Sequence, residues 1–172
     1  MSPTVVVLGS VLGAVLLLAV AGGWLKAVLV VVTVTGASME PALRSGDRVI
    51  VRRTLGRRVR RGQIVMFRLP EQARPAAGTH PDLPPAEPVR GGRRLDDRFL
   101  LKRAVAVPGD AVPDRVDPAL RRQAGTPVPE NRLVVLGDNA PASFDSRNFG
   151  FVASDLVLGV VLRPVPGAVR ER

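Results

Sequence analysis

The sequence predicts a mainly β protein, an antiparallel β domain preceded by one N-terminal transmembrane helix. Six short segments rich in β-branched residues recur along the chain, separated by Gly, Pro or Asp, which is typical of strands. One long uncharged apolar run precedes them, and few other stretches show a helical period of hydrophobic residues. We therefore assign residues 1–25 to a membrane anchor and residues 26–172 to a β-rich domain.

The first element is the apolar run Val5–Ala21, which contains no charged residue. With one flanking residue at each end it supplies roughly the 20 residues that a helix needs to cross a bilayer. Trp24 and Lys26 then suit the membrane interface. A cleavable secretory signal is the alternative, because Ala19–Ala21 has the small-x-small form of a cleavage site, but no Lys or Arg precedes the run.

The β-rich domain contains six predicted strands and one long loop. Helical turns are expected only after Ser38 and around Ala119–Arg122. Residues 70–97 are dominated by Pro, Gly, Ala and Arg without a hydrophobic pattern, which predicts a flexible loop. The predicted strands are Ala27–Thr35, Asp47–Arg53, Gln63–Leu69, Arg98–Val107, Arg132–Gly137 and Leu156–Arg163.

Composition excludes several kinds of site. Cysteine is absent and His80 is the only histidine, so thiol nucleophiles, disulfides and His-based triads are not expected, and we expect no metal and no cofactor. The lysines are Lys26 and Lys102. Because arginine stays protonated, Lys102 is the only amine beyond the apolar run that could act as a base.

The net charge of +10 would suit anionic lipid or nucleic acid. The basic residues are nearly all Arg scattered through loops, and aromatic residues make up only 3% of the chain. Few side chains could therefore stack on bases. We expect membrane lipid as a partner and no nucleic acid.

Three segments carry the functional signal. They are TGASMEPAL (Thr35–Leu43), FLLKRAVAVPGD (Phe99–Asp110) and LGDNAPASFDSRNFG (Leu136–Gly150). Each alone reads as a turn or a surface ion pair. Together and in this order they resemble the bacterial type I signal peptidases, a serine protease family with a Ser/Lys dyad, whose pattern is S-M-x-P, then K-R followed by P-G-D, then G-D-N-x-x-x-S-x-D-S-R. Arg44–Val51, Arg61–Phe67 and Val128–Asn139 agree further, so the resemblance omits little except residues 70–97 and 113–126.

The resemblance implies a catalytic domain of signal-peptidase type with Ser38 as nucleophile and Lys102 as general base. The lysine must then be neutral, so burial has to lower its pKa from about 10.4. Ser143 matches the serine that orients the lysine. The Ser38 N–H should hold the oxyanion, whereas Gly36 stands where some relatives have a second hydroxyl donor, so the second donor is either the Gly36 backbone or absent.

Charged residues beside these positions are expected to form structural ion pairs. Arg103 should point to the face of its strand opposite Lys102 and pair with Asp138 or Asp145, and Arg147 belongs to the same set. The family usually has Thr at the position of Ala42 and Asp at that of Gln63. These departures suggest a divergent member.

The resemblance further implies an extended substrate peptide laid as an added strand between the segment leading to Ser38 and the strand of Lys102. Small pockets should accept Ala at the first and third positions before the cut. The substrates would be pre-proteins held at the cell membrane, and we expect a single-pass protein with its catalytic domain on the outer face. The positive-inside rule favours the cytoplasm, but long domains cross regardless of charge. The expected pocket residues are Thr35, Gly36, Met39, Leu43, Leu100 and Leu101.

Three other functions compete with this one. A protease of the same superfamily could clip the leader of one dedicated partner. A non-enzymatic, basic membrane-surface protein would explain the charge equally well but not the motifs. A self-cleaving Ser/Lys repressor is disfavoured, because nothing in the sequence resembles a DNA-reading helix pair.

Overall fold

The computed structural model describes residues 28–70, 73, 99–116 and 118–164, together with residues 13, 15–17, 19 and 23. The chain divides into two compact units, residues 1–30 and 31–172. The expected anchor and the loop at 70–97 lie almost wholly outside the described residues. Within the described part of the chain, no helix combines the length and the apolar character needed to cross a membrane, so the anchor stays a prediction.

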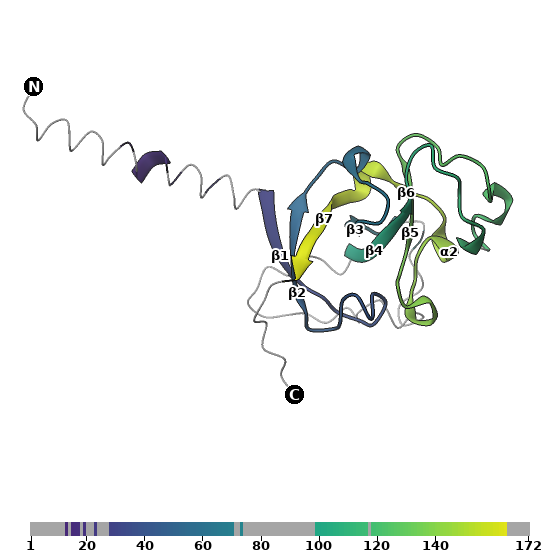
Figure 1. The fold of residues 1–172 in the computed structure, drawn as a ribbon, viewed down its shortest axis with the longest axis horizontal. Helices are drawn as coiled ribbons and strands as arrows, with labels where there is room; N and C mark the ends of the chain where they lie inside the picture. The colour runs from purple at the N-terminus through teal and green to yellow at the C-terminus, as the bar shows by residue number, and fades with distance from the viewer. Residues whose placement is uncertain are drawn as a thin grey trace, which may run out of the picture. The chain divides into compact units, whose positions relative to one another are not determined.

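The strands form one seven-stranded sheet in the order β1-β2-β7-β3-β4-β5-β6, and Figure 1 shows β2 and β7 running side by side. The neighbouring pairs from β2 to β6 along this order are antiparallel, which confirms the predicted mainly antiparallel β domain. The two-residue strand β6 was not predicted. The strands are β1 (Leu29–Thr33), β2 (Arg48–Arg53), β3 (Ile64–Arg68), β4 (Phe99–Ala106), β5 (Arg132–Leu136), β6 (Val152–Ala153) and β7 (Val157–Pro164).

The helices described in residues 31–164 are short and lie in the connections between strands. The α-helix α2 covers Ser146–Phe149 and follows β5. The 3-10 helices are η1 (Gly56–Arg58), η3 (Asp114–Val116), η4 (Arg121–Gln123), η5 (Ala140–Ala142) and η6 (Ser154–Leu156).

Strand β2 shows the alternation of buried and exposed side chains that is typical of a strand. In β2, Val49 and Val51 are fully buried, whereas the flanking Arg48 and Arg52 are exposed, as expected when every second residue faces the core. Irregularities in the register interrupt the β2–β7, β3–β7 and β4–β5 pairings. Such bulges bend and twist a sheet locally.

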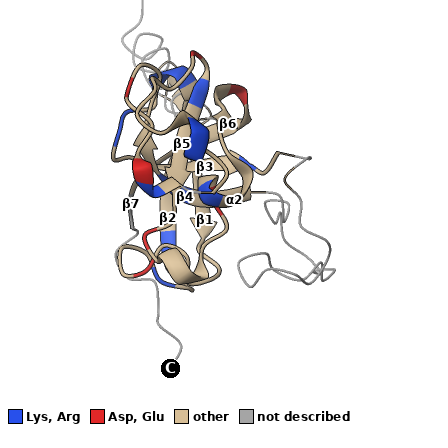
Figure 2. Cartoon of the chain, turned by 90° about the vertical axis from the view of Figure 1, so that its right-hand side faces the viewer, with Lys and Arg blue, Asp and Glu red and all other residues tan. Residues whose placement is uncertain are grey.

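Three apolar clusters form the core of the larger unit. One includes Phe67, Leu100 and Leu133, with Phe149 packed on Phe67 at a ring-centroid distance of 6.2 Å. A second is formed by residues of β4, β5 and the segment between them. A third is formed by residues of the connection from β1 to β2, among them Met39, and by residues of β2 and β3. Basic residues are spread over several elements of the surface (Figure 2).

Candidate active site

Ser38 lies in the connection between β1 and β2, which packs tightly against the domain. Its ends are tied by hydrogen bonds from the Val34 N–H to Asp47 O (2.8 Å) and from the Gly46 N–H to Val34 O (2.9 Å). Met39, next to Ser38, is 1% exposed in the third apolar cluster. These contacts hold Ser38, itself 8% exposed, in a fixed segment of chain.

Gly36, two residues before Ser38, has a φ of +86°. L-residues with a side chain rarely adopt this left-handed conformation, whereas glycine does so readily. Glycine therefore suits the backbone conformation at position 36, where some relatives have a hydroxyl residue.

Lys102 is in the middle of β4 and is 1% exposed. It is paired with Val65 of β3, and its side chain shares a strand face with Leu100 and Ala104 because alternate residues point the same way. Both of those residues belong to the first apolar cluster. The surroundings of the lysine are thus largely apolar.

Gly137 is the point where the segments of Ser38, Lys102 and Ser143 converge. An ideal Cβ on Gly137 would clash with Ser143 Oγ and would lie 2.6 Å from Ser38 O. Arg103 is paired with Leu136, and one further step along this antiparallel register sets Lys102 opposite Gly137. Directly opposed residues point to the same face, with Cβ atoms about 4.5–5.5 Å apart. The Ser143 hydroxyl therefore lies on the face of the sheet that carries the Lys102 side chain.

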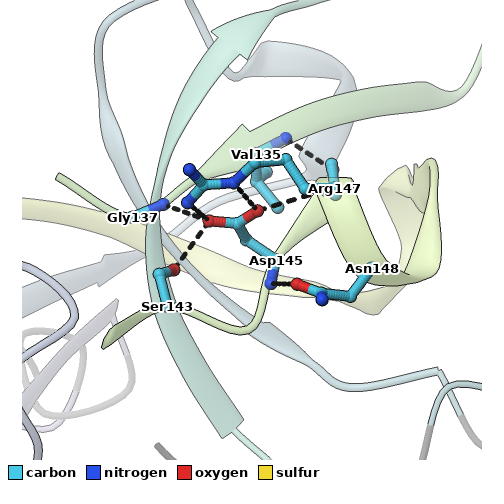
Figure 3. Close-up of polar contacts among 7 residues, drawn as sticks. Val135, Gly137, Ser143, Asp145, Arg147 and Asn148 are labelled. Atoms are coloured by element: carbon cyan, nitrogen blue, oxygen red, sulfur yellow. Dashed lines mark hydrogen bonds and ion pairs between the residues drawn. The ribbon is translucent and has the colours of Figure 1, made fainter. Parts of the chain in front are cut away.

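Asp145 accepts a hydrogen bond from the Ser143 hydroxyl and thereby fixes its orientation (Figure 3). Its Oδ2 accepts hydrogen bonds from Ser143 Oγ (2.6 Å), the Gly137 N–H (2.8 Å) and Arg147 Nη2 (2.6 Å). Burial acts to raise the pKa of Asp145, but the hydrogen bonds from Arg147 and Ser143 outweigh it and hold that pKa below its ordinary value. Asp145 is therefore a carboxylate, and the Ser143 hydroxyl hydrogen points toward it.

Local sequence explains how Asp145 reaches this position. It caps α2, with its side chain accepting from the Arg147 N–H while the Asn148 side chain accepts from the Asp145 N–H (Figure 3). This reciprocal arrangement is a capping box. Ser146, the first residue of α2, accepts a hydrogen bond from the Val135 N–H (2.9 Å) and so ties the helix to β5.

Arg103 forms its ion pair with Asp138, the first of the two partners considered from the sequence. Nε and Nη2 donate to the two carboxylate oxygens at 2.8 and 2.6 Å, and Nη1 donates to Gly62 O at 2.8 Å. A bidentate contact of this kind fixes the guanidinium plane relative to the carboxylate plane. The pair joins the strand of Lys102 to the residue that follows Gly137.

Asn139 connects the same loop to the Ser38 segment. Its backbone N–H donates to Ser38 O at 2.9 Å, and its side-chain Nδ2 donates to Ala37 O at 3.1 Å. The motifs alone did not single out Gly137 or Asn139. Both belong to the G-D-N box, but the Ser38 segment that both approach lies about a hundred positions away in the sequence.

The residues expected to line substrate pockets occupy different environments. Thr35 is exposed and Gly36 half-buried, whereas Met39 and Leu43 are 1% and 2% exposed within the third cluster. Leu100 and Leu101 belong to opposite faces of β4, one in the first cluster and one against the third. Among the residues that the structure describes, no group of His, Asp or Glu is arranged to hold a metal ion.

Comparison with known proteins agrees with the motif pattern. The sequence profile of the signal peptidases, peptidase S26, matches residues 7–117 and 113–165. The chain belongs to this family.

Individual relatives are similar over about three quarters of the chain. A probable signal peptidase I-2 of Synechocystis sp. is 31% identical over 157 residues, covering 77% of this chain and 62% of the relative. A mitochondrial ATP-independent inner membrane protease subunit 1b of Arabidopsis thaliana is 31% identical, covering 74% and 64%. Signal peptidase I V of Bacillus subtilis is 28% identical, covering 79% and 85%. The chain thus spans less than two thirds of the first two relatives' length.

Proposed function

We propose that this signal peptidase family member is a membrane-bound serine endopeptidase that removes N-terminal signal peptides from exported pre-proteins, with Ser38 and Lys102 as its catalytic dyad. The convergence at Gly137 is the observation that carries the proposal. It brings the Ser38 main chain and the Ser143 hydroxyl to the strand face of Lys102. The single histidine of the chain, His80, lies outside the described residues, whereas the amine of Lys102 belongs to this strand face.

In the proposed acylation step, the neutral Nζ of Lys102 takes the hydroxyl proton as Ser38 Oγ attacks the scissile carbonyl carbon. The carbonyl π pair moves to oxygen, which the Ser38 N–H binds. The C–N bond then breaks and the leaving amine takes the proton from Lys102. Water, deprotonated by the same lysine, attacks the acyl carbon, and Ser38 Oγ leaves with the proton that Lys102 returns to it. Burial of Lys102 supports this role, because an apolar environment disfavours the ammonium form.

Ser143 would orient the lysine in this scheme. Its hydroxyl hydrogen is directed to Asp145, so its oxygen lone pairs can accept a hydrogen bond from Lys102 Nζ. Asp145 is fixed in turn by Arg147 and the Gly137 N–H. The chain of contacts would hold Nζ toward Ser38 rather than leave it to rotate.

For substrate, we propose an extended peptide that enters beside Thr35 and Gly36, the accessible part of the expected pocket set. The buried Met39 and Leu43 would form the base of a shallow pocket. Such pockets favour small residues at the first and third positions before the cut, because a larger side chain clashes. Bulky replacements at either position of a model substrate should slow cleavage about a hundredfold.

We further propose a single-pass cell-membrane protein, anchored by residues 1–25, with the catalytic domain on the outer face and in contact with lipid. The apolar run Val5–Ala21 supports this topology. Sequencing the N-terminus of the mature protein tests it. A chain beginning at Gly22 would contradict a retained anchor.

A second candidate is a maturation protease dedicated to one partner protein. The similarity to the Arabidopsis inner membrane protease subunit supports this second candidate, because a protein similar to this chain is named a protease but not a signal peptidase. Substrate breadth separates the two functions. A general enzyme should process several unrelated precursors with Ala-x-Ala before the cut, and a dedicated enzyme should not.

The deciding experiment is a cleavage assay of the purified full-length chain on a panel of such precursors, with Ser38→Ala as the negative control. A serine-acylating inhibitor should label the wild type at Ser38 and leave the variant unlabelled. Absence of both cleavage and labelling would contradict the protease and leave the non-enzymatic membrane-surface protein.

A further inference from the structure

A single residue binds the two carbonyl groups that flank Ser38. The Asn139 backbone N–H donates to Ser38 O at 2.9 Å, and the Asn139 side-chain Nδ2 donates to Ala37 O at 3.1 Å. The two segments are 102 positions apart in the sequence. Asn139 therefore fixes both peptide planes next to the Ser38 Cα.

The contact to Ala37 O also determines where the Ser38 N–H points. The Ala37–Ser38 peptide bond is trans, and in a planar trans peptide the C=O and the N–H point in opposite directions. Fixing the carbonyl of Ala37 thus directs the N–H of Ser38 away from Asn139. No backbone carbonyl of the described residues accepts a hydrogen bond from this N–H.

A second donor reinforces the same peptide. The Glu40 N–H donates to Ala37 O at 3.1 Å, so this carbonyl accepts two hydrogen bonds. Hydrogen bonds to a carbonyl polarise the peptide and strengthen its N–H as a donor. The Ser38 N–H is therefore both aimed and strengthened for binding a negatively charged oxygen.

We propose that Asn139 is the positioning residue for the oxyanion donor, acting through the Ala37–Ser38 peptide without touching substrate. This inference rests on the proposed function. The preceding residue, Asp138, is held by Arg103 of the Lys102 strand. The G-D-N loop thereby contacts both the strand of the proposed base and the peptide of the proposed oxyanion donor.

The chemistry of the contact requires an amide at position 139. Ala37 O is an acceptor, so its partner must carry an N–H or O–H. An aspartate has nearly the same shape as asparagine but places a carboxylate oxygen against the carbonyl. Asn139→Ala removes the contact and Asn139→Asp makes it repulsive, while both keep the backbone N–H.

The test compares these variants with the wild-type full-length chain, using an Ala-x-Ala peptide substrate and titrating active Ser38 with an acylating inhibitor. The control is Thr126→Val, which removes a side-chain hydrogen bond to a turn carbonyl, Gln123 O, outside the site. A peptide boronate, which forms an anionic tetrahedral adduct with serine, reports on the oxyanion donor. A peptide with a reduced scissile bond lacks the carbonyl and reports on ground-state binding.

We expect Asn139→Ala to lower kcat per titrated site about 30-fold, less than the hundredfold or more lost with a whole oxyanion donor. KM should change less than twofold, and boronate affinity should fall as kcat does while binding of the reduced peptide is unchanged. Asn139→Asp should be worse, and Thr126→Val should match the wild type.

Two results would overturn the inference alone: a kcat per titrated site within threefold of wild type, or equal loss of affinity for both peptides. A merely structural role predicts the first of these, with fewer active sites and a lower Tm. Failure of the wild type to cleave or to be acylated would instead overturn the proposed function, and the inference with it.

Discussion

The hydroxyl group of Ser143 occupies the space that a side chain on Gly137 would need. An ideal Cβ on Gly137 would lie 2.6 Å from Ser143 Cβ and from Ser38 O, closer than non-bonded carbon atoms approach. One neighbour carries the proposed lysine-orienting hydroxyl, and the other is the main chain of the proposed nucleophile. Glycine at position 137 therefore sets how closely these two segments approach.

Gly137→Ala should reduce kcat/KM by more than a hundredfold. The methyl group must displace either Ser143 or the Ser38 main chain, and a displacement of about 1 Å can cost that much. The same overpacking should lower the free energy of unfolding by about 1–3 kcal/mol. Steady-state cleavage and urea denaturation measure the two effects.

The control for Gly137→Ala is Gly125→Ala. Gly125 has a φ of +76° and nothing within 4 Å of an added Cβ, so this variant strains the backbone away from the site. It should lose stability but keep its kcat/KM below its melting temperature. Comparable activity losses in both variants would show that stability, and not the approach of Ser143 to Ser38, limits cleavage.

Gly36→Ser tests whether this chain can use a hydroxyl two residues before the nucleophile. At a φ of +86° a side chain costs about 1–2 kcal/mol, so the variant should shift the backbone next to Ser38 and lower kcat. Gly36→Ala introduces the same strain without a hydroxyl. Equal kcat values for the two variants are expected, and a kcat above wild type in Gly36→Ser alone would show that a missing donor had been restored.

The depressed pKa of Asp145 predicts a loss of stability in acid. Since its folded pKa lies below the ordinary carboxyl value near 3.9, its contribution to the free energy of unfolding is complete above about pH 4–5 and is lost as pH falls through the folded pKa. Asp145→Asn should cost about 3 kcal/mol at pH 7, because Arg147 loses its buried partner. Urea denaturation of both proteins between pH 2 and 7 should show the difference shrinking in acid.

Asp155→Asn is the control for the acid series. Asp155 is an exposed carboxylate in η6, where a substitution usually changes the free energy of unfolding by less than about 0.5 kcal/mol. A difference between wild type and Asp145→Asn that stays constant down to pH 2 would contradict the proposed ionised state of Asp145.

The strands were predictable because they are short segments rich in β-branched residues, and in β2 the buried residues also alternate with exposed ones. Val49 and Val51 are these buried residues. Strand order and register were not predictable. Pairings such as Val65 with Lys102 join positions far apart in sequence, and β6 has only two residues, too short for any periodicity.

At the candidate site, sequence supplied the residues through motif resemblance but not their contacts. The closeness of Gly137 to Ser143 and the two bonds of Asn139 depend on loops that fold back across the sheet. The burial of Met39 and Leu43 was not predicted: both were expected at a substrate pocket, and both pack in the core with under 3% exposure. A motif reports that a residue matters and leaves open whether it contacts substrate or supports the loop.

Lys102→Arg should leave a folded protein that does not cleave substrate. Arginine keeps a long basic chain but cannot release its proton near neutral pH, so it cannot deprotonate Ser38. Because position 102 is 1% exposed, the larger side chain should also cost about 1–3 kcal/mol of stability, and Tm measurements must show that the variant is folded at the assay temperature. Lys26→Arg, at the only other lysine, is the control and should retain activity.

The pH dependence of cleavage by the wild type should also identify Lys102 as the base. If Lys102 is the base, kcat/KM rises with pH along a limb centred below 10.4, the ordinary pKa of lysine, because only the neutral amine accepts the serine proton. Lys102→Met, similar in length but without an ionisable group, should lack both the limb and inhibitor labelling at Ser38. Cleavage by Lys102→Arg at more than a few per cent of the wild-type rate would contradict the Ser/Lys mechanism and leave His80 or a carboxylate as the base.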